Sequence, residues 1–171
     1  MNQPMSALEP GAAAPEFSLP DDKGQVHSLA EGLAKGPVLL VFFKVSCPTC
    51  QYALPFFERL HKRLADAPVS LWAVSQNSID HTKAFGREFG VETLPVLFDS
   101  DEEAYPVSNV YGITHVPTTF LIEPNGEIGL TSVGWSKDDT AAISRRLGQA
   151  GAQPSLTLFE PQESVLAFRP G

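Results

Sequence analysis

The chain contains very little cysteine: among its 171 residues only Cys47 and Cys50 carry a thiol. Two cysteines three positions apart cannot join distant segments, so a scaffold held together by several disulfides is excluded. Basic residues are not in excess either, since 12 Lys and Arg stand against 20 Asp and Glu. The formal net charge of −8 argues against a nucleic-acid partner, whose phosphates require a basic protein surface.

Long apolar runs are also missing. The sequence has no stretch of about 18 apolar residues, so we expect no membrane-spanning helix and no membrane partner. The first residues, MNQPMSALEPGAAAPEF, have neither the basic nor the apolar region of a signal peptide. We therefore expect a cytoplasmic protein. In that reducing compartment, a close cysteine pair indicates redox chemistry or metal binding.

Segments with strand and helix patterns alternate along the chain. Expected strands cover 37–44, 69–75, 94–99, 118–122 and 127–134, and expected helices cover 47–65, 78–90, 101–112 and 136–151. Turn residues between two short strand-like pieces predict a hairpin over 17–29. The alternation predicts an α/β fold with a central mixed β-sheet and helices on both faces.

The length suits one domain, which we expect over residues 1–151 with a lead-in over 1–11. Residues 152–171 are rich in Pro and Gln, and we expect them to form an extended C-terminal tail. Through Leu156, Phe159 and Phe168 this tail could pack back on the domain, or it could contact a partner or a second subunit.

The Cys-Pro-Thr-Cys motif stands where the apolar segment 37–44 ends and an amphipathic helix begins. At a helix N-terminus, free backbone N–H groups and the helix dipole favour an anion. They typically lower a cysteine pKa from about 8.5 to about 3.5–7.5, which we expect for Cys47. Cys50 lies one turn further in and is better shielded. We therefore expect Cys47 to attack a substrate disulfide and Cys50 to resolve the mixed disulfide. Pro48 suits the first helical turn.

Other interpretations of the pair stay open. The two cysteines could be unrelated small core residues in a redox-inert interaction module. A zinc site needs four ligands, and only His27, His61, His81 and His115 could supplement the pair. Of these only His115 has a plausible approach, and with the two thiols it would suit Cu(I) or another soft metal. His115 could equally be a surface residue or a proton donor facing the cysteines. Lys44 is either an ordinary solvated residue at the end of the strand or a positive charge that favours the Cys47 thiolate.

The order of these segments resembles the thioredoxin superfamily. The N-terminal hairpin, the strand VLLVFFK, the Cys-x-x-Cys helix and the later HVPTTFLIEPNGEI follow the family's order over about residues 12–150. The segment between Ser75 and Tyr105 resembles the helix and strand inserted in the TlpA-like and AhpC/TSA (peroxiredoxin-like) branches. The resemblance implies a cis peptide bond before Pro117. It also implies that Val116, with His115 beside it, offers a backbone edge to an extended substrate.

The sequence departs from the family's pattern in several places. Ser46 replaces the usual Trp before the first cysteine, and Pro48-Thr49 replaces Gly-Pro between the cysteines. Val41 stands where relatives carry the buried Asp that relays a proton from the second cysteine. Peroxiredoxins need a Thr and an Arg to polarise the peroxide bond. Here Lys44 stands in the Thr position, and no Arg occurs between residues 88 and 144.

The residues and the resemblance together predict an enzyme: a thiol–disulfide oxidoreductase that reduces protein or small-molecule disulfides. The resemblance implies no cofactor beyond a redox-active Cys47–Cys50 disulfide, and no metal. It implies an electron donor such as a thioredoxin reductase or glutathione, and a role in cell redox homeostasis. The first alternative is an atypical thiol peroxidase of the AhpC/TSA antioxidant type, with Cys50 as resolving thiol. The second is a soft-metal binding protein.

Overall fold

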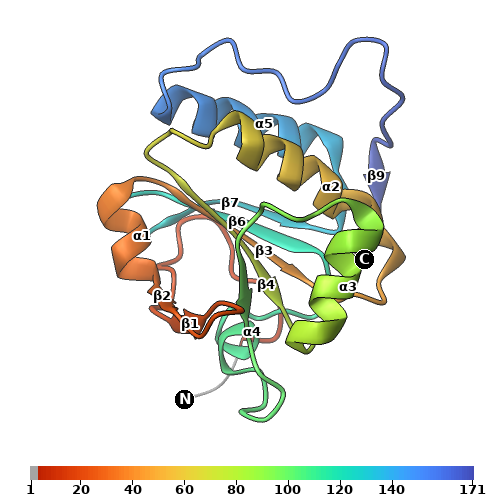
Figure 1. The fold of residues 1–171 in the computed structure, drawn as a ribbon. Coiled ribbons are helices and arrows are strands. Elements are labelled where there is room, and N and C mark those ends of the chain that lie inside the picture. The colour runs from red at the N-terminus through yellow and green to blue at the C-terminus, as the bar shows by residue number, and fades with distance from the viewer. Residues whose placement is uncertain (1–3) are drawn as a thin grey trace.

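The computed structural model describes residues 4–171, so the first three residues of the expected lead-in lie outside the described part (Figure 1). The strands are β1 (Ser18–Pro20), β2 (Val26–Ser28), β3 (Val38–Phe43), β4 (Ser70–Ser75), β5 (Val96–Phe98), β6 (Thr118–Ile122), β7 (Ile128–Val133), β8 (Trp135–Ser136) and β9 (Phe168–Arg169). The helices are α1 (Leu29–Lys35), α2 (Pro48–Arg63), α3 (Ile79–Phe89), α4 (Pro106–Val110) and α5 (Lys137–Ala150).

A five-stranded sheet with the order β5-β4-β3-β6-β7 forms the centre of the molecule. β3 pairs in parallel with β4, and β4 with β5, whereas β6 pairs antiparallel with both β3 and β7. This arrangement confirms the predicted mixed sheet. The inserted helix and strand are α3 and β5, and the N-terminal hairpin is the antiparallel pair of β1 and β2.

The central strand β3 is buried over its whole length because both faces of the sheet are covered. Side chains alternate along a strand, so its apolar run divides between two cores. Leu39, Val41 and Phe43 pack with residues of α2, α3 and α5. Val38, Leu40 and Phe42 pack with residues of the hairpin, α1 and α4. Figure 1 shows α2 and α5 above the sheet and β1, β2 and α4 below it.

Two local features differ from the expectation. The helix α1 directly follows the hairpin and was not predicted, although Ser28-Leu29-Ala30-Glu31 has the pattern of a helix start. The Ser28 hydroxyl indeed accepts a hydrogen bond from the Glu31 amide. The helix expected over 101–112 is reduced to Pro106–Val110. A residue before proline is disfavoured in the helical conformation, and Tyr105 has a φ of 53°.

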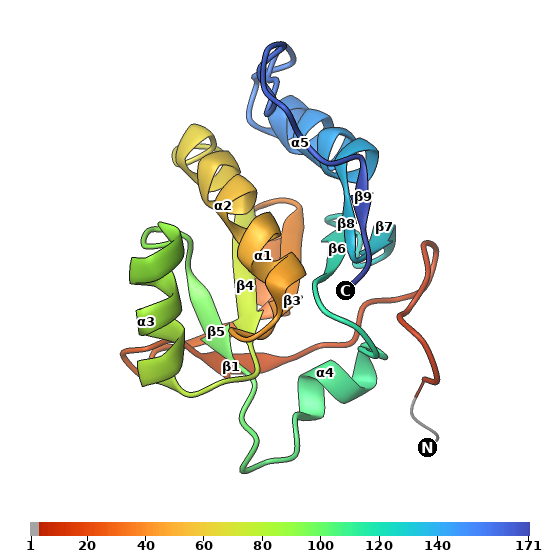
Figure 2. The same ribbon diagram turned by 90° about the vertical axis from the view of Figure 1, so that its right-hand side faces the viewer.

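The segment 152–171 folds back over α2 and α5 instead of leaving the domain (dark blue in Figures 1 and 2). Leu158 is buried in the same apolar core as residues of α2 and α5, and Leu156 and Phe159 are partly buried against that core. Phe168, in contrast, is 61% exposed. Among residues 4–171, no helix combines the length and apolar character that a membrane span requires.

A buried carboxylate on α2 fixes the segment that leads into β5. Glu58 is 3% exposed and accepts hydrogen bonds from the amides of Thr93 and Leu94 and from the Thr93 hydroxyl. Burial acts to raise the pKa of Glu58, but these hydrogen bonds and the charge of Lys62 outweigh it. The pKa therefore lies below its ordinary value of 4.5.

We predict that Glu58→Gln lowers the free energy of unfolding by about 1.5–3 kcal/mol at pH 7, because hydrogen bonds to a charged group are lost. Urea denaturation measures this difference, and Glu88→Gln on the exposed face of α3 is the control. Since the folded-state pKa is depressed, the stabilisation is present above pH 4.5 and is lost as pH falls below it. A loss that matches the control, or that does not shrink in acid, would contradict this role.

Candidate active site

The sheet topology brings two distant segments to one edge. Because β3 and β6 are antiparallel, the end of β3 lies beside the start of β6, and Phe42 pairs with Thr118. The segment 44–47, which follows β3, therefore meets the segment 113–117, which precedes β6. The cysteine motif and Pro117 belong to these two segments, so the register of one strand pair determines that they face each other.

Cys47 is the N-cap of α2 and has extended backbone angles. Its Sγ accepts a hydrogen bond from the Cys50 backbone N–H at 3.3 Å, in the way that a Ser or Asp side chain caps a helix. Pro48 follows as the first helical residue, where its missing N–H costs no hydrogen bond. The half-buried Cys47 and the fully buried Cys50 are both free thiols. The predicted difference in shielding between them is thus present.

Val116 and Pro117 lie opposite the cysteine motif. The Val116–Pro117 peptide bond is cis, as the resemblance implied. The Cys47 thiol donates a hydrogen bond to the Val116 carbonyl oxygen at a sulfur–oxygen distance of 3.3 Å. The residue expected to bind a substrate backbone is therefore in direct contact with the residue expected to attack the substrate.

The environment of Cys50 opposes its ionisation. Burial raises the pKa of the Cys50 thiol above its ordinary value, and the neighbouring Cys47 acts in the same direction. A backbone hydrogen bond at Lys44 acts in the opposite direction, together with the charge of its side chain. Val41, in the position of the family's buried Asp, is 1% exposed and pairs with Thr119 of β6. Cys50 consequently stays protonated at neutral pH until its environment changes.

The other residues predicted to support the site divide into two groups. Lys44, Ser46, Pro48 and His115 are exposed. The His115 ring lies beside the hydroxyl of the preceding Thr114, with a distance of 3.0 Å between nitrogen and oxygen.

Thr49 differs from this exposed group because it is 3% exposed and donates a hydrogen bond to the Pro170 carbonyl. The middle of the cysteine motif is therefore bonded to the far end of the chain.

Two side chains that hold the loop before Cys47 were not predicted. Asn77, which follows β4, accepts a hydrogen bond from the Val45 amide at 2.9 Å. Gln51, which follows Cys50, donates one to the Val45 carbonyl at 3.0 Å. Together they satisfy both backbone groups of Val45 and fix the loop. Asn77 belongs to this site because β4 is parallel to β3, and no local motif reveals that pairing.

Within residues 4–171, metal ligands do not gather at the cysteines. In the part of the chain described here, no three His, Cys, Asp or Glu side chains lie close enough together to hold a metal ion. A metal at Cys47 and Cys50 would thus need ligands from elsewhere.

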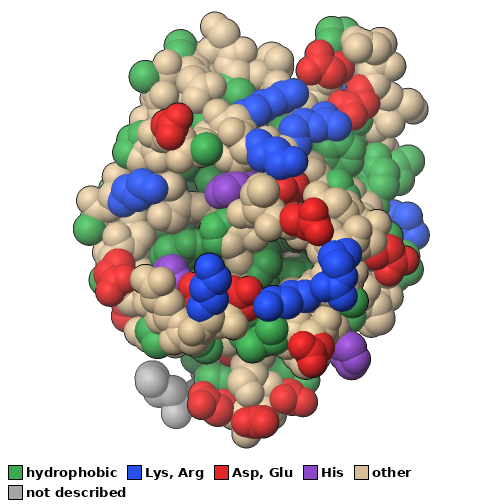
Figure 3. Space-filling model, in the orientation of Figure 1, with side chains coloured by type: hydrophobic (Ala, Val, Ile, Leu, Met, Phe, Trp, Pro, Cys, Tyr) green, Lys and Arg blue, Asp and Glu red, His purple; other side chains and the backbone are tan. Residues whose placement is uncertain are grey.

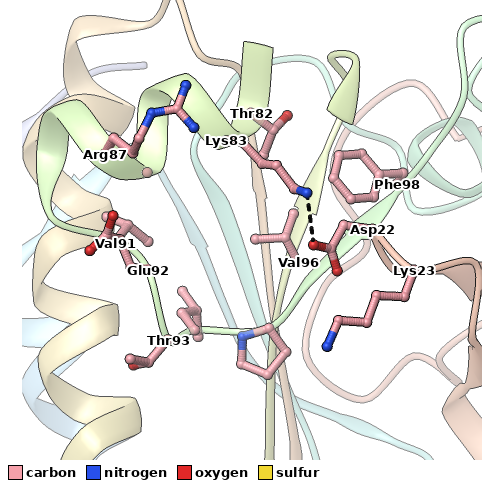
Figure 4. A pocket seen from close by; sticks show the side chains of 13 residues that line it. Asp22, Lys23, Thr82, Lys83, Arg87, Val91, Glu92, Thr93, Val96 and Phe98 are labelled. Carbon is pink, nitrogen blue, oxygen red and sulfur yellow. Dashed lines mark ion pairs between the residues drawn. The ribbon is translucent and has the colours of Figure 1, made fainter. Parts of the chain in front are cut away.

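A cleft lies apart from the cysteines (Figures 3 and 4). It has a volume of about 500 Å³ and lies between the turn of the β1–β2 hairpin, α3 and the segment 91–98. Lys83 and Asp22 form an ion pair of 3.4 Å across it, and Figure 4 shows Arg87 and Glu92 further along its wall. Neither cysteine lines this cleft, so it is separate from the thiol site.

Comparison with known proteins identifies the family. The family model described as AhpC/TSA matches residues 10–131. The chain belongs to the AhpC/TSA family. It is 32% identical over 124 residues to thiol-disulfide oxidoreductase ResA of Geobacillus thermodenitrificans, covering 72% of this chain and 68% of that protein. ResA of Bacillus subtilis is 31% identical over 123 residues, covering 71% and 66%.

A solved structure agrees with this family assignment at the level of the fold. The thioredoxin domain of a thiol-disulfide oxidoreductase from Bacteroides vulgatus matches with a TM-score of 0.71 at 21% identity, covering 82% of this chain and 98% of that one. Together, these matches confirm the predicted thioredoxin-superfamily fold and the prediction of an oxidoreductase.

For this AhpC/TSA protein we predict that iodoacetamide at neutral pH modifies Cys47 and leaves Cys50 unmodified in the folded state. Cys47 is half-buried, whereas Cys50 has no exposed surface and keeps its proton. Mass spectrometry of tryptic peptides counts the labels, and the same reaction in urea gives the fully labelled control. Labelling of both thiols at equal rates in the folded protein would contradict the asymmetry.

Proposed function

We propose that the protein reduces disulfides of protein or small-molecule substrates through Cys47 and Cys50. The observation that carries the proposal is the contact of the Cys47 thiol with both the Cys50 amide and the Val116 carbonyl. The three groups that the reaction needs thus lie next to one another: the Cys47 thiol as nucleophile, the Cys50 thiol one helical turn away, and the Val116 backbone edge.

The proposed reaction has two steps. The Cys47 thiolate attacks one sulfur of the substrate disulfide, forms a mixed disulfide and releases the other substrate sulfur as a thiolate, which takes up a proton. The Cys50 thiol then loses its proton and attacks the Cys47 sulfur. This step forms the Cys47–Cys50 disulfide and releases the second substrate thiol. Two electrons and two protons pass to the substrate.

The regeneration of the dithiol completes the proposed cycle. A donor dithiol, of the kind that a thioredoxin reductase system or glutathione supplies, would return two electrons to the Cys47–Cys50 disulfide. In a reducing cytoplasm this direction is favoured. The raised pKa of Cys50 makes its deprotonation the demanding event, because no carboxylate in residues 4–171 is among the groups that act on the thiol.

Peroxide reduction is the alternative that family membership suggests, and we favour disulfide reduction for a structural reason. A peroxidatic thiol needs neighbouring donors that polarise the O–O bond. At the Thr position of peroxiredoxins this chain has Lys44, whose side chain is exposed at the end of β3.

We predict that Cys47→Ser abolishes the reduction of insulin disulfides, whereas Cys50→Ser still forms a mixed disulfide but does not release it. The reason is that only Cys47 meets the substrate and only Cys50 can resolve the intermediate. Turbidity measures insulin reduction, and non-reducing electrophoresis detects the trapped species. Ser155→Ala on the exposed tail is the control. Undiminished insulin reduction by Cys47→Ser would exclude the proposal.

A further inference from the structure

One face of α2 contacts the C-terminal tail, residues 152–171. Thr49, Tyr52, Phe56, Arg59 and Arg63 recur every three or four residues and therefore line a single stripe of the helix. Every one of them contacts the segment 157–170.

At the C-terminal end of α2, Arg63 donates to the Thr157 carbonyl, and Arg59 forms a two-fold hydrogen-bonded ion pair with Glu163 at 2.8 and 2.7 Å. The ring of Phe56 meets that of Phe159 edge-on.

Nearer the cysteines the contacts continue. The Tyr52 hydroxyl accepts a hydrogen bond from the Leu166 amide at 2.9 Å, and Thr49 donates to the Pro170 carbonyl at 2.6 Å. The contacts run from Arg63 with Thr157 at one end of α2 to Thr49 with Pro170 at the other, so the tail runs antiparallel to the helix overall. The last residues of the tail therefore lie at the end of the helix where Cys47 is the N-cap.

The other side of the tail is fixed by β8 and its neighbours. The Trp135 indole N–H donates to the Leu166 carbonyl at 2.7 Å, and the Lys137 amide donates to the Ala167 carbonyl. Trp135 and Ser136 then pair with β9 in an antiparallel ladder. Figure 2 shows β9 beside β8, with the end of the chain in the middle of this face of the molecule.

The final residue reaches the expected substrate edge. Gly171 lies against the Val116 backbone so closely that a β-carbon at position 171 would overlap the Val116 carbonyl oxygen. The same oxygen accepts the hydrogen bond from the Cys47 thiol. The tail and the proposed nucleophile thus converge on one carbonyl group.

We propose that residues 168–171 occupy the substrate-binding edge beside Cys47, and that a protein disulfide substrate must displace them to react. The regulatory effect of this autoinhibitory contact rests on the proposed function, because the contact covers the same thiol site. The contacts of residues 157–166 with α2 keep the occupying residues at a high effective concentration after they leave. A large substrate needs the whole edge free, whereas a small reagent needs only the thiol.

The test compares two maleimides of equal chemistry on the reduced protein: N-ethylmaleimide and a maleimide attached to a long polyethylene glycol chain. A displaced form of this kind typically makes up about 0.1–10% of the population, so freeing the edge should accelerate the large reagent at Cys47 by about tenfold or more. The reaction with N-ethylmaleimide should change far less. The variants are a chain without residues 168–171 and, as a point change, Gly171→Ala, which cannot keep the contact with Val116.

Ser164→Ala, in the exposed part of the same tail, is the matched control and should react like the unaltered chain. Label counts by mass spectrometry show whether Cys50 stays protected, which reports that the variants are folded. If both variants react with the large reagent no faster than the control, the edge is free and the proposal is overturned. Gly171→Ala decides the matter alone if the shortened chain exposes Cys50.

Insulin reduction separates this proposal from the one on which it rests. If both proposals hold, the shortened chain reduces insulin several-fold faster than the full chain. If no variant reduces insulin, the proposed function fails, while the maleimide ratio still tests whether the tail occupies the edge.

Discussion

The antiparallel pairing of β3 with β6 is the interaction on which the rest of the structure depends. It joins the end of one buried strand to the start of another, and so places Cys47 against Val116 although 69 positions separate them. Both strands are buried, and a shift of one residue would turn every side chain of β3 into the wrong core. The apolar packing on two faces thus also fixes the geometry of the thiol site.

The remaining parts of the site lie at the same edge of the sheet. The parallel strand β4 contributes Asn77, which holds the loop before Cys47. The antiparallel strand β7 leads to Gly134, whose amide donates to the Pro117 carbonyl at 2.7 Å. Gly134 has a φ of 79°, and a side chain there would press on the Arg169 backbone. The path of β9 over the site therefore requires a glycine at this turn.

Much of this arrangement could be predicted from sequence, because the signals were local. The alternation of strand-like and helix-like segments along the chain predicted the central strands and helices. The Cys-Pro-Thr-Cys motif predicted a helix start at Cys47. The contact with Val116 came from the resemblance alone, since no local pattern shows which strands pair.

The course of the tail could not be predicted. Thr49 and Tyr52 read as ordinary residues of an amphipathic helix, and only the folded chain shows that they bond to residues more than 110 positions away.

The redox equilibrium of the Cys47–Cys50 pair shows whether the two thiols act as a reducing couple. The protein is equilibrated with glutathione buffers of known ratio, and the free thiols are trapped and counted. We expect a reversible two-electron transition near the value of a reductant such as thioredoxin, about −270 mV. A potential near that of a strong oxidant, about −120 mV, or the failure of the two thiols to form a disulfide, would contradict it.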